Sequence, residues 1–191
     1  TLYFAAVETT QSLLGTSLYY LTKHPGWAGI VSEEYASFGA DEALSLNKTP
    51  QIRDFLSETL RMNAPVPATY RYTVKDVVIG DYRIPKGSMI YMSFQSMHRD
   101  RKIWGETADN YDPDRFLEDT NGELSRSLIP FGSGIRVCIG KYLALMEAAI
   151  FIGEITTQLN LSMPADQDLP LGYASGTLRV KDELKLQISP K

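Results

Sequence analysis

Residues 131–140 read Phe131-Gly132-Ser133-Gly134-Ile135-Arg136-Val137-Cys138-Ile139-Gly140. An apolar stretch with helical character follows, so Cys138 precedes a predicted helix whose free N–H groups and positive end stabilise a thiolate. Gly132 and Gly134 allow positive φ angles and let the backbone approach a flat ligand closely. Gly140 leaves room beside the helix for a large ring, and Arg136 supplies a cation for a carboxylate on a bound cofactor.

Other roles for Cys138 are less well supported by the sequence. A lone cysteine is most often a small buried packing residue. A zinc site needs several Cys or His ligands, and the only histidines are His24 and His98. A nucleophilic cysteine needs a partner histidine, which here could come only from spatial proximity. With one cysteine no intramolecular disulfide is possible, which favours a reducing, intracellular setting.

The composition is that of a globular domain. The chain has 191 residues, 43% of them hydrophobic, and a net charge of −4. It carries no basic run, so we expect no nucleic-acid partner. No apolar run reaches the roughly 18–20 residues that span a bilayer. The sequence opens directly in apolar helical residues without a leader. We therefore expect the chain to begin inside a longer protein, which leaves membrane anchoring open.

The periodicity predicts a mostly helical chain with a small β part. Helices are expected over residues 1–23, 27–38, 50–62 and 139–159. Thr49 is expected to cap the third of these, with Pro50 at its first position. Short strands joined by tight turns are expected within 69–92, an irregular segment over 99–137, and terminal strands at 178–180 and 184–188.

Glu58 and Arg61 stand three residues apart on the predicted helix 50–62. Both lie off the apolar stripe of this helix, so the pattern alone places them in water. An exposed pair of this kind contributes about 0.2–0.5 kcal/mol and is very common in helices.

The cysteine segment resembles the haem loop of the cytochrome P450 family, and the resemblance runs along the whole chain. It implies the C-terminal, haem-binding part of a cytochrome P450 fold, mainly α with small β-sheets, without the N-terminal half. Cys138 would be the ligand of the iron of haem b. Phe131, Gly132, Arg136 and Gly140 would contact the cofactor.

Further segments match the family in order. Glu58 and Arg61 resemble its Glu-x-x-Arg helix, and Arg115, preceded by Asp114 where glutamate is more usual, resembles the arginine that completes a charge network. Such a network would pin the irregular segment 99–137 onto the core, and breaking one partner would cost about 3–5 kcal/mol. Arg71 and His98 resemble residues that, with Arg136, bind the haem propionates.

The predicted first helix contains Ala5-Ala6-Val7-Glu8-Thr9-Thr10. It resembles the oxygen-activating segment of the family, in which an acid precedes a threonine. Glu8 and Thr9 would then relay protons as catalytic residues. Ala6 replaces the more usual glycine, and its methyl group narrows the space beside the oxygen. Thr10 is about 100° further around the helix, so we expect it to face elsewhere.

The resemblance implies a monooxygenase that inserts one atom of dioxygen into a small apolar organic substrate. Electrons would come from NAD(P)H through a reductase or a ferredoxin. Two alternatives stay open: a haem-thiolate isomerase or peroxygenase, which the pair Glu8-Thr9 disfavours, and a non-catalytic or incomplete fragment without haem. A Soret band, or its absence, separates the last alternative from the others.

Overall fold

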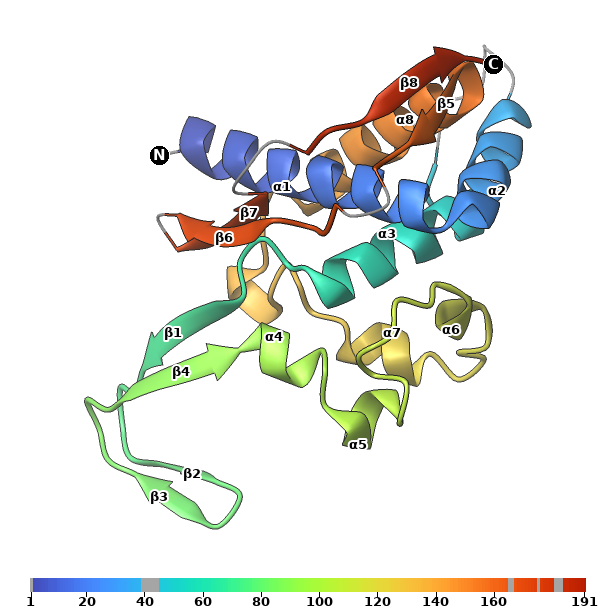
Figure 1. Cartoon of the computed structure of the whole chain (residues 1–191). Coiled ribbons are helices and arrows are strands. Elements are labelled where there is room, and N and C mark those ends of the chain that lie inside the picture. The colour runs from blue at the N-terminus through green and yellow to red at the C-terminus, as the bar shows by residue number, and fades with distance from the viewer. Residues whose placement is uncertain (1, 39–44, 165–166, 175, 181–183) are drawn as a thin grey trace.

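The computed structural model describes residues 2–38, 45–164, 167–174, 176–180 and 184–191. Within these ranges the chain is mainly helical with small antiparallel sheets, as expected (Figure 1). The helices are α1 Leu2–Lys23, α2 Pro25–Ala36, α3 Pro50–Met62, α4 Phe94–Met97, α5 Arg101–Trp104, α6 Asp114–Leu117, α7 Glu123–Ser127, the 3-10 turn η1 Gly134–Arg136 and α8 Lys141–Gln158. The strands are β1 Ala68–Tyr72, β2 Val77–Ile79, β3 Tyr82–Ile84, β4 Met89–Ser93, β5 Leu159–Ser162, β6 Leu171–Ala174, β7 Thr177–Val180 and β8 Gln187–Pro190.

The four long helices match the predicted ones to within a few residues, and Thr1 lies outside the described residues. They share one apolar core, in which Leu21 of α1, Val31 of α2, Phe55 of α3 and Ile152 of α8 are almost fully buried. The core forms because each helix turns its apolar side chains toward the other three. It fixes α1, α3 and α8 relative to one another.

The start of α3 is capped differently from the prediction. The Thr49 hydroxyl donates to the Ser45 carbonyl (3.1 Å) and makes no cap bond. Instead the Glu34 carboxylate of α2 accepts from the backbone N–H groups of Gln51 (3.1 Å) and Ile52 (2.7 Å). A carboxylate satisfies free N–H groups and the positive helix end at once. The sequence could not show this, because Glu34 reaches the helix through the tertiary fold.

Helices α2 and α8 approach closely at Gly153. A methyl group at this position would lie 2.1 Å from Cδ2 and 2.4 Å from Cγ of the Tyr35 ring. The Tyr35 hydroxyl donates to Glu154 Oε1 (2.8 Å) across the same contact. Gly153 therefore sets the distance between these two helices.

Each sheet is a single antiparallel pair: β1 with β4, β2 with β3, β5 with β8 and β6 with β7. The pair β1–β4 aligns Arg71 with Ile90 and projects with β2–β3 away from the helices (Figure 1). Strand β7 packs along α1, where the Ser12 hydroxyl donates to the Leu178 carbonyl (2.6 Å). The sequence did not predict β5 or β6, and β8 begins at Gln187 rather than at Leu184.

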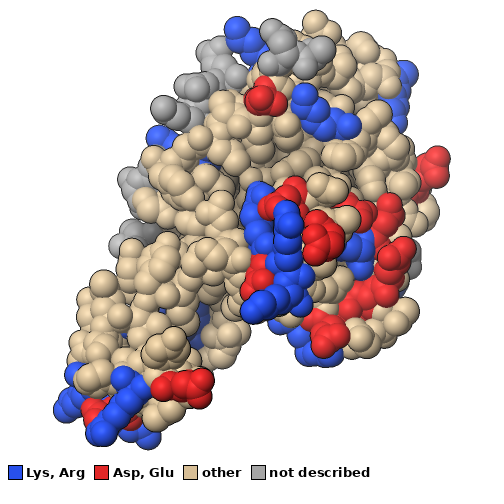
Figure 2. All heavy atoms as spheres, turned by 60° about the horizontal axis from the view of Figure 1, so that its bottom comes forward, with Lys and Arg blue, Asp and Glu red and all other residues tan. Residues whose placement is uncertain are grey.

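Segment 99–137 holds only short helical turns, as its composition predicted. Charged side chains gather over this side of the molecule and at the tip of the β2–β3 hairpin (Figure 2). Exposed ion pairs join Arg101 to Glu106 (3.4 Å) and Asp109 (3.5 Å), and Arg83 to Asp76 (3.0 Å). Exposed pairs contribute little to stability, so the segment must be held mainly by buried contacts. Among the described residues no helix is both long enough and apolar enough to cross a lipid bilayer.

Candidate functional site

Cys138 lines a cavity of about 340 Å³ that lies between α1, β1, the cysteine loop and the start of α8. We call this the cysteine cavity. Its walls are mostly apolar, and several of its large side chains are strongly exposed, among them Leu2, Ile139 and Leu143. A mostly apolar, partly open hollow with a few polar groups is the usual form of a cofactor or ligand site.

The backbone of the cysteine loop has the shape that its glycines predicted. Gly132 and Gly134 take φ angles of 70° and 68°, a region that favours glycine. The Cys138 N–H donates to the Phe131 carbonyl (2.9 Å), which closes the loop and leaves the thiol exposed. Helix α8 begins only at Lys141, three residues after Cys138. The thiol therefore lies just before the N-terminus of α8, as the sequence predicted.

Two cations face the same cavity. Arg136 in η1 and Arg71 in β1 both line it, and neither pairs with a carboxylate of any residue described by the structure. The hydrogen bonds of Arg71 within the described ranges are local, to the Thr69 hydroxyl (3.2 Å) and the Tyr70 carbonyl (2.8 Å). A soft sulfur ligand, an apolar hollow and two cations without carboxylate partners fit a flat metallo-cofactor that carries carboxylates. The residues present thus fit haem.

Phe131, Gly132 and Gly140 also line the cysteine cavity, and so do Leu143, Ala144 and Glu147. The last three were not predicted from the sequence. Their positions after Gly140 follow the spacing i+3, i+4, i+7, which places them on one helix face. This spacing was the available signal, and the extension of the cavity along α8 could have been predicted from it.

On α1 the structure separates the two predicted relay residues. Thr9 lines the cavity, and its hydroxyl donates to the Ala5 carbonyl one turn earlier (2.6 Å). Glu8 does not line it, because its carboxylate faces β7, 3.7 Å from Arg179 and 3.4 Å from the Thr177 hydroxyl. Thr10 does line the cavity, so the expectation that it faces elsewhere was wrong. The cavity is wide enough to span both helix positions.

Glu58 and Arg61 are completely buried, which contradicts the exposed position indicated by the helix pattern alone. The Arg61 guanidinium donates twice to the Glu58 carboxylate, at 2.7 and 2.8 Å. Arg115 is 7% exposed, and its Nε donates to Glu58 Oε1 (3.1 Å). The structure thus brings these three residues together. These charged side chains can be buried because each one pairs with an opposite charge and makes hydrogen bonds within the network.

The same arginines bind the irregular segment through its backbone. Arg61 donates to the carbonyls of His98 (2.8 Å), Ala108 (2.6 Å) and Asn110 (2.9 Å). Arg115 donates to the Asn110 carbonyl as well (3.2 Å). None of these residues lines the cysteine cavity. The network therefore anchors part of segment 99–137 on α3 and takes no direct part in the cavity.

His98 is fully buried and does not line the cysteine cavity. Its Nε2 accepts from the Ile129 N–H (3.1 Å), and burial, aided by Arg61, lowers the pKa of the ring to about 4. A neutral imidazole in this position cannot serve as a cation for a propionate. The geometry argues against the role expected for His98 and gives it another, the support of the backbone just before the cysteine loop.

Comparison with known proteins agrees with this geometry. The family model for cytochrome P450 matches residues 1–188. Steroid 17-alpha-hydroxylase/17,20 lyase of Gallus gallus is 33% identical over 179 residues, which are 87% of this chain and 34% of that protein. Bifunctional cytochrome P450/NADPH–P450 reductase 2 of Bacillus subtilis is 33% identical over all of this chain and 18% of its own length.

Among solved structures, retinoic acid-bound cyanobacterial CYP120A1 superposes with a TM-score of 0.87 at 26% identity, covering all of this chain and 44% of that one. The chain spans about a third of the first curated relatives that it matches. The match of the family model over almost the whole chain, together with the cysteine cavity, shows that this chain belongs to the cytochrome P450 family.

Proposed function

We propose that this chain forms the haem-binding part of a haem-thiolate monooxygenase with Cys138 as the iron ligand. The observation that supports this proposal best is that the Cys138 thiol, the Thr9 hydroxyl and two arginines line one apolar cavity. Neither arginine pairs with a carboxylate in the part of the chain that the structure describes. When bound, haem would supply the iron centre at which dioxygen is activated and one oxygen atom is transferred to an organic substrate.

Each residue of the cavity has a definite task in this proposal. Arg71 and Arg136 pair with the two propionates, and Cys138 is held for ligation by the bond from its own N–H to Phe131. The apolar walls exclude water and favour an apolar substrate. The Thr9 hydroxyl donates to the Ala5 carbonyl, which leaves its oxygen free to accept a hydrogen bond from a proton donor in the cavity. To pass a proton on, the hydroxyl turns its own O–H from Ala5 toward the acceptor in the cavity, while its oxygen takes up the proton of that donor.

Glu8 takes part only indirectly in this proposal. Its carboxylate lies on the β7 side of α1, beside Arg179, so it cannot touch a ligand in the cysteine cavity. It is one residue from Thr9 and its side chain is 24% exposed, so water can reach the carboxylate. We propose that it supplies protons to the relay rather than delivering them itself.

The proposal also requires an electron donor. We propose NAD(P)H as the source, through a reductase or a ferredoxin. The Bacillus subtilis relative is named as a cytochrome P450 joined to an NADPH–P450 reductase, which supports this kind of donor. The proposed substrate is a small apolar organic molecule, because the cavity walls are mostly apolar.

The ferrous–carbon monoxide spectrum of the full-length protein tests the assignment. We expect a thiolate-type Soret band for the unaltered protein and its loss in Cys138→Ser, since a hydroxyl does not replace a thiolate as iron ligand. Ser133→Ala, in the same loop, serves as the matched control and should keep the band. An unchanged thiolate-type band in Cys138→Ser would refute the proposal.

A further inference from the structure

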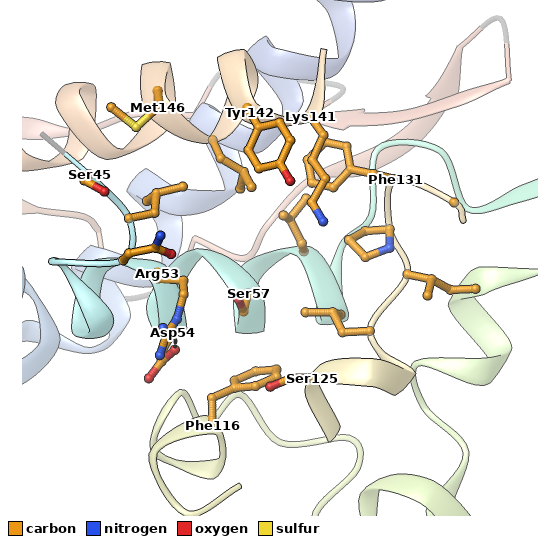
Figure 3. Close-up of a pocket in the computed structure, with 18 residues that line it drawn as sticks. Ser45, Arg53, Asp54, Ser57, Phe116, Ser125, Phe131, Lys141, Tyr142 and Met146 are labelled. Carbon is orange, nitrogen blue, oxygen red and sulfur yellow. Dashed lines mark hydrogen bonds and ion pairs between the residues drawn. The ribbon is translucent and has the colours of Figure 1, made fainter. Parts of the chain in front are cut away.

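A second cavity, of about 610 Å³, lies between the first half of α3, the start of α8 and residues 116–132 (Figure 3). We call it the α3–α8 cavity. It contains no residue of α1 or β1, and it shares only Leu60, Pro130, Phe131 and Gly132 with the cysteine cavity. Its volume falls in the range of small-molecule sites, roughly 300–1,000 Å³.

The wall of the α3–α8 cavity carries a buried carboxylate, and only one of its two oxygens accepts a hydrogen bond from a described residue. Asp54 is 2% exposed, and its Oδ1 accepts from Arg53 Nε (2.8 Å). Its Oδ2 is buried and has no hydrogen-bond partner among the described residues. Burial raises the pKa of this carboxyl, against the opposing effect of Arg53. A buried polar atom of this kind calls for a donor, which a ligand in the cavity can provide.

The wall formed by α8 carries a cation that has no anionic partner among the described residues. Lys141 is the first residue of α8, and it makes no ion pair with any residue that the structure describes. In Figure 3 its side chain points into the cavity beside Tyr142. Arg53 is already paired with Asp54, so Lys141 and the positive end of α8 leave the cavity with a net positive charge. This favours a ligand with one anionic group.

We propose that the α3–α8 cavity binds apolar monocarboxylates that carry a hydroxyl or amide N–H donor at the far end. The carboxylate pairs with Lys141, and the donor bonds to Asp54 Oδ2. The body of the ligand packs on the apolar lining residues Phe116, Leu128 and Leu145. The site uses none of the residues assigned to oxygen activation, so it does not rest on the proposed monooxygenase function.

The position of this site links it to the cysteine loop. Phe131 lines both cavities, and its carbonyl accepts from the Cys138 N–H (2.9 Å). A ligand in the α3–α8 cavity therefore touches the residue that closes the loop around the thiol. It does so without entering the cysteine cavity.

Calorimetric titration of the full-length, haem-loaded protein tests the proposal. The probe is 3-(4-hydroxyphenyl)propionate, which has a carboxylate at one end and a phenol at the other. Its analogues 3-phenylpropionate and 4-ethylphenol each lack one of these groups. Each analogue should bind roughly tenfold or more weakly to the unaltered protein, because a charge-assisted hydrogen bond is lost.

Two variants assign the contacts to their residues. Asp54→Leu, which keeps the branched shape of the side chain but removes both carboxylate oxygens, should weaken the phenol-bearing probe about tenfold and should not weaken 3-phenylpropionate. Lys141→Met should weaken the probe to a similar degree and leave 4-ethylphenol unchanged. Lys102→Met, on α5 and outside the cavity, is the matched control and should bind like the unaltered protein.

A competition experiment shows in which of the two cavities the probe binds. An iron-coordinating azole fills the cysteine cavity, and the probe should still bind with the same affinity. Loss of probe binding in the presence of the azole would overturn the proposal, because it would place the probe in the cysteine cavity. Absence of any binding, or equal probe affinity in Asp54→Leu and the unaltered protein, would overturn it as well.

Discussion

The contact between Gly153 and Tyr35 makes Gly153→Ala a sensitive test of the helix packing. The added methyl would lie 2.1 Å from Cδ2, 2.4 Å from Cγ and 2.7 Å from Cε2 of the ring. Cγ is bonded directly to the Cβ of Tyr35, so the ring cannot escape by moving its far end. Either the ring must leave its rotamer and its bond to Glu154, or α2 and α8 must separate.

The size of the effect follows from two opposing contributions. Overpacking of a close contact costs about 1–3 kcal/mol. Alanine in a helix is favoured over glycine by about 1 kcal/mol. The expected net loss in the free energy of unfolding is therefore about 0–2 kcal/mol, and the short contact with the Tyr35 ring places Gly153→Ala toward the upper end. Gly29→Ala in α2 has open space around its new methyl group, so it should gain about 0.5–1 kcal/mol instead.

Denaturant unfolding of the full-length protein, followed by circular dichroism and by haem absorbance, measures both changes. A second control combines Gly153→Ala with Tyr35→Ala, in which the obstructing ring is absent. The methyl group should then cost nothing and the helix gain should appear. The packing argument fails if Gly153→Ala is as stable as Gly29→Ala, or if removing the Tyr35 ring leaves its cost unchanged.

Three further predictions concern the site and its support. Thr9→Ala should keep the haem spectrum but slow the proton-dependent step by about 10²–10⁴. Less product and more hydrogen peroxide per NAD(P)H would show this, and an unchanged ratio would exclude Thr9 from the relay. Glu58→Gln leaves Arg61 and Arg115 buried without their shared anion, and it should lower the free energy of unfolding by about 3–5 kcal/mol. A decrease below about 1 kcal/mol, as for an exposed ion pair, would contradict the buried network. Burial lowers the pKa of His98 to about 4 in the folded protein, from about 6.5 in the unfolded chain. Between these two pH values the unfolded chain binds a proton at His98 and the folded chain does not. The free energy of unfolding should therefore fall as the pH is lowered from 6.5 to 4. His98→Gln should flatten this fall, and an equally steep pH profile in the variant would count against a neutral buried ring.

Local sequence signals were sufficient for much of the fold. The stop at Lys23-His24-Pro25, the proline at the start of α3 and the apolar periodicity placed the four long helices to within a few residues. These signals act through backbone geometry and neighbouring side chains, so they can be read without knowledge of the fold. The terminal strands were predicted less well, because short strands depend on partners far along the chain, as β5 depends on β8.

The cysteine loop was equally well determined by the sequence. Its two positive-φ glycines, its cysteine and its arginine lie within ten residues, and their order alone indicated a cofactor loop. The more distant network of Glu58, Arg61 and Arg115 was expected only through resemblance to the family. The helix pattern placed the first two in water, because it counts apolar residues and cannot detect a buried charge that is satisfied by distant carbonyls.

The sequence by itself therefore determined the four long helices and the loop that carries the thiol, because these depend on contacts between residues close along the chain. Only the tertiary structure decided which side chains face the cavity: Thr10 lines it, whereas Glu8 turns toward Arg179 and His98 supports Ile129. The half-satisfied Asp54 in its own cavity was likewise visible only after folding. Residue spacing indicates which side chains share a helix face, but the burial of that face depends on how distant elements pack against it.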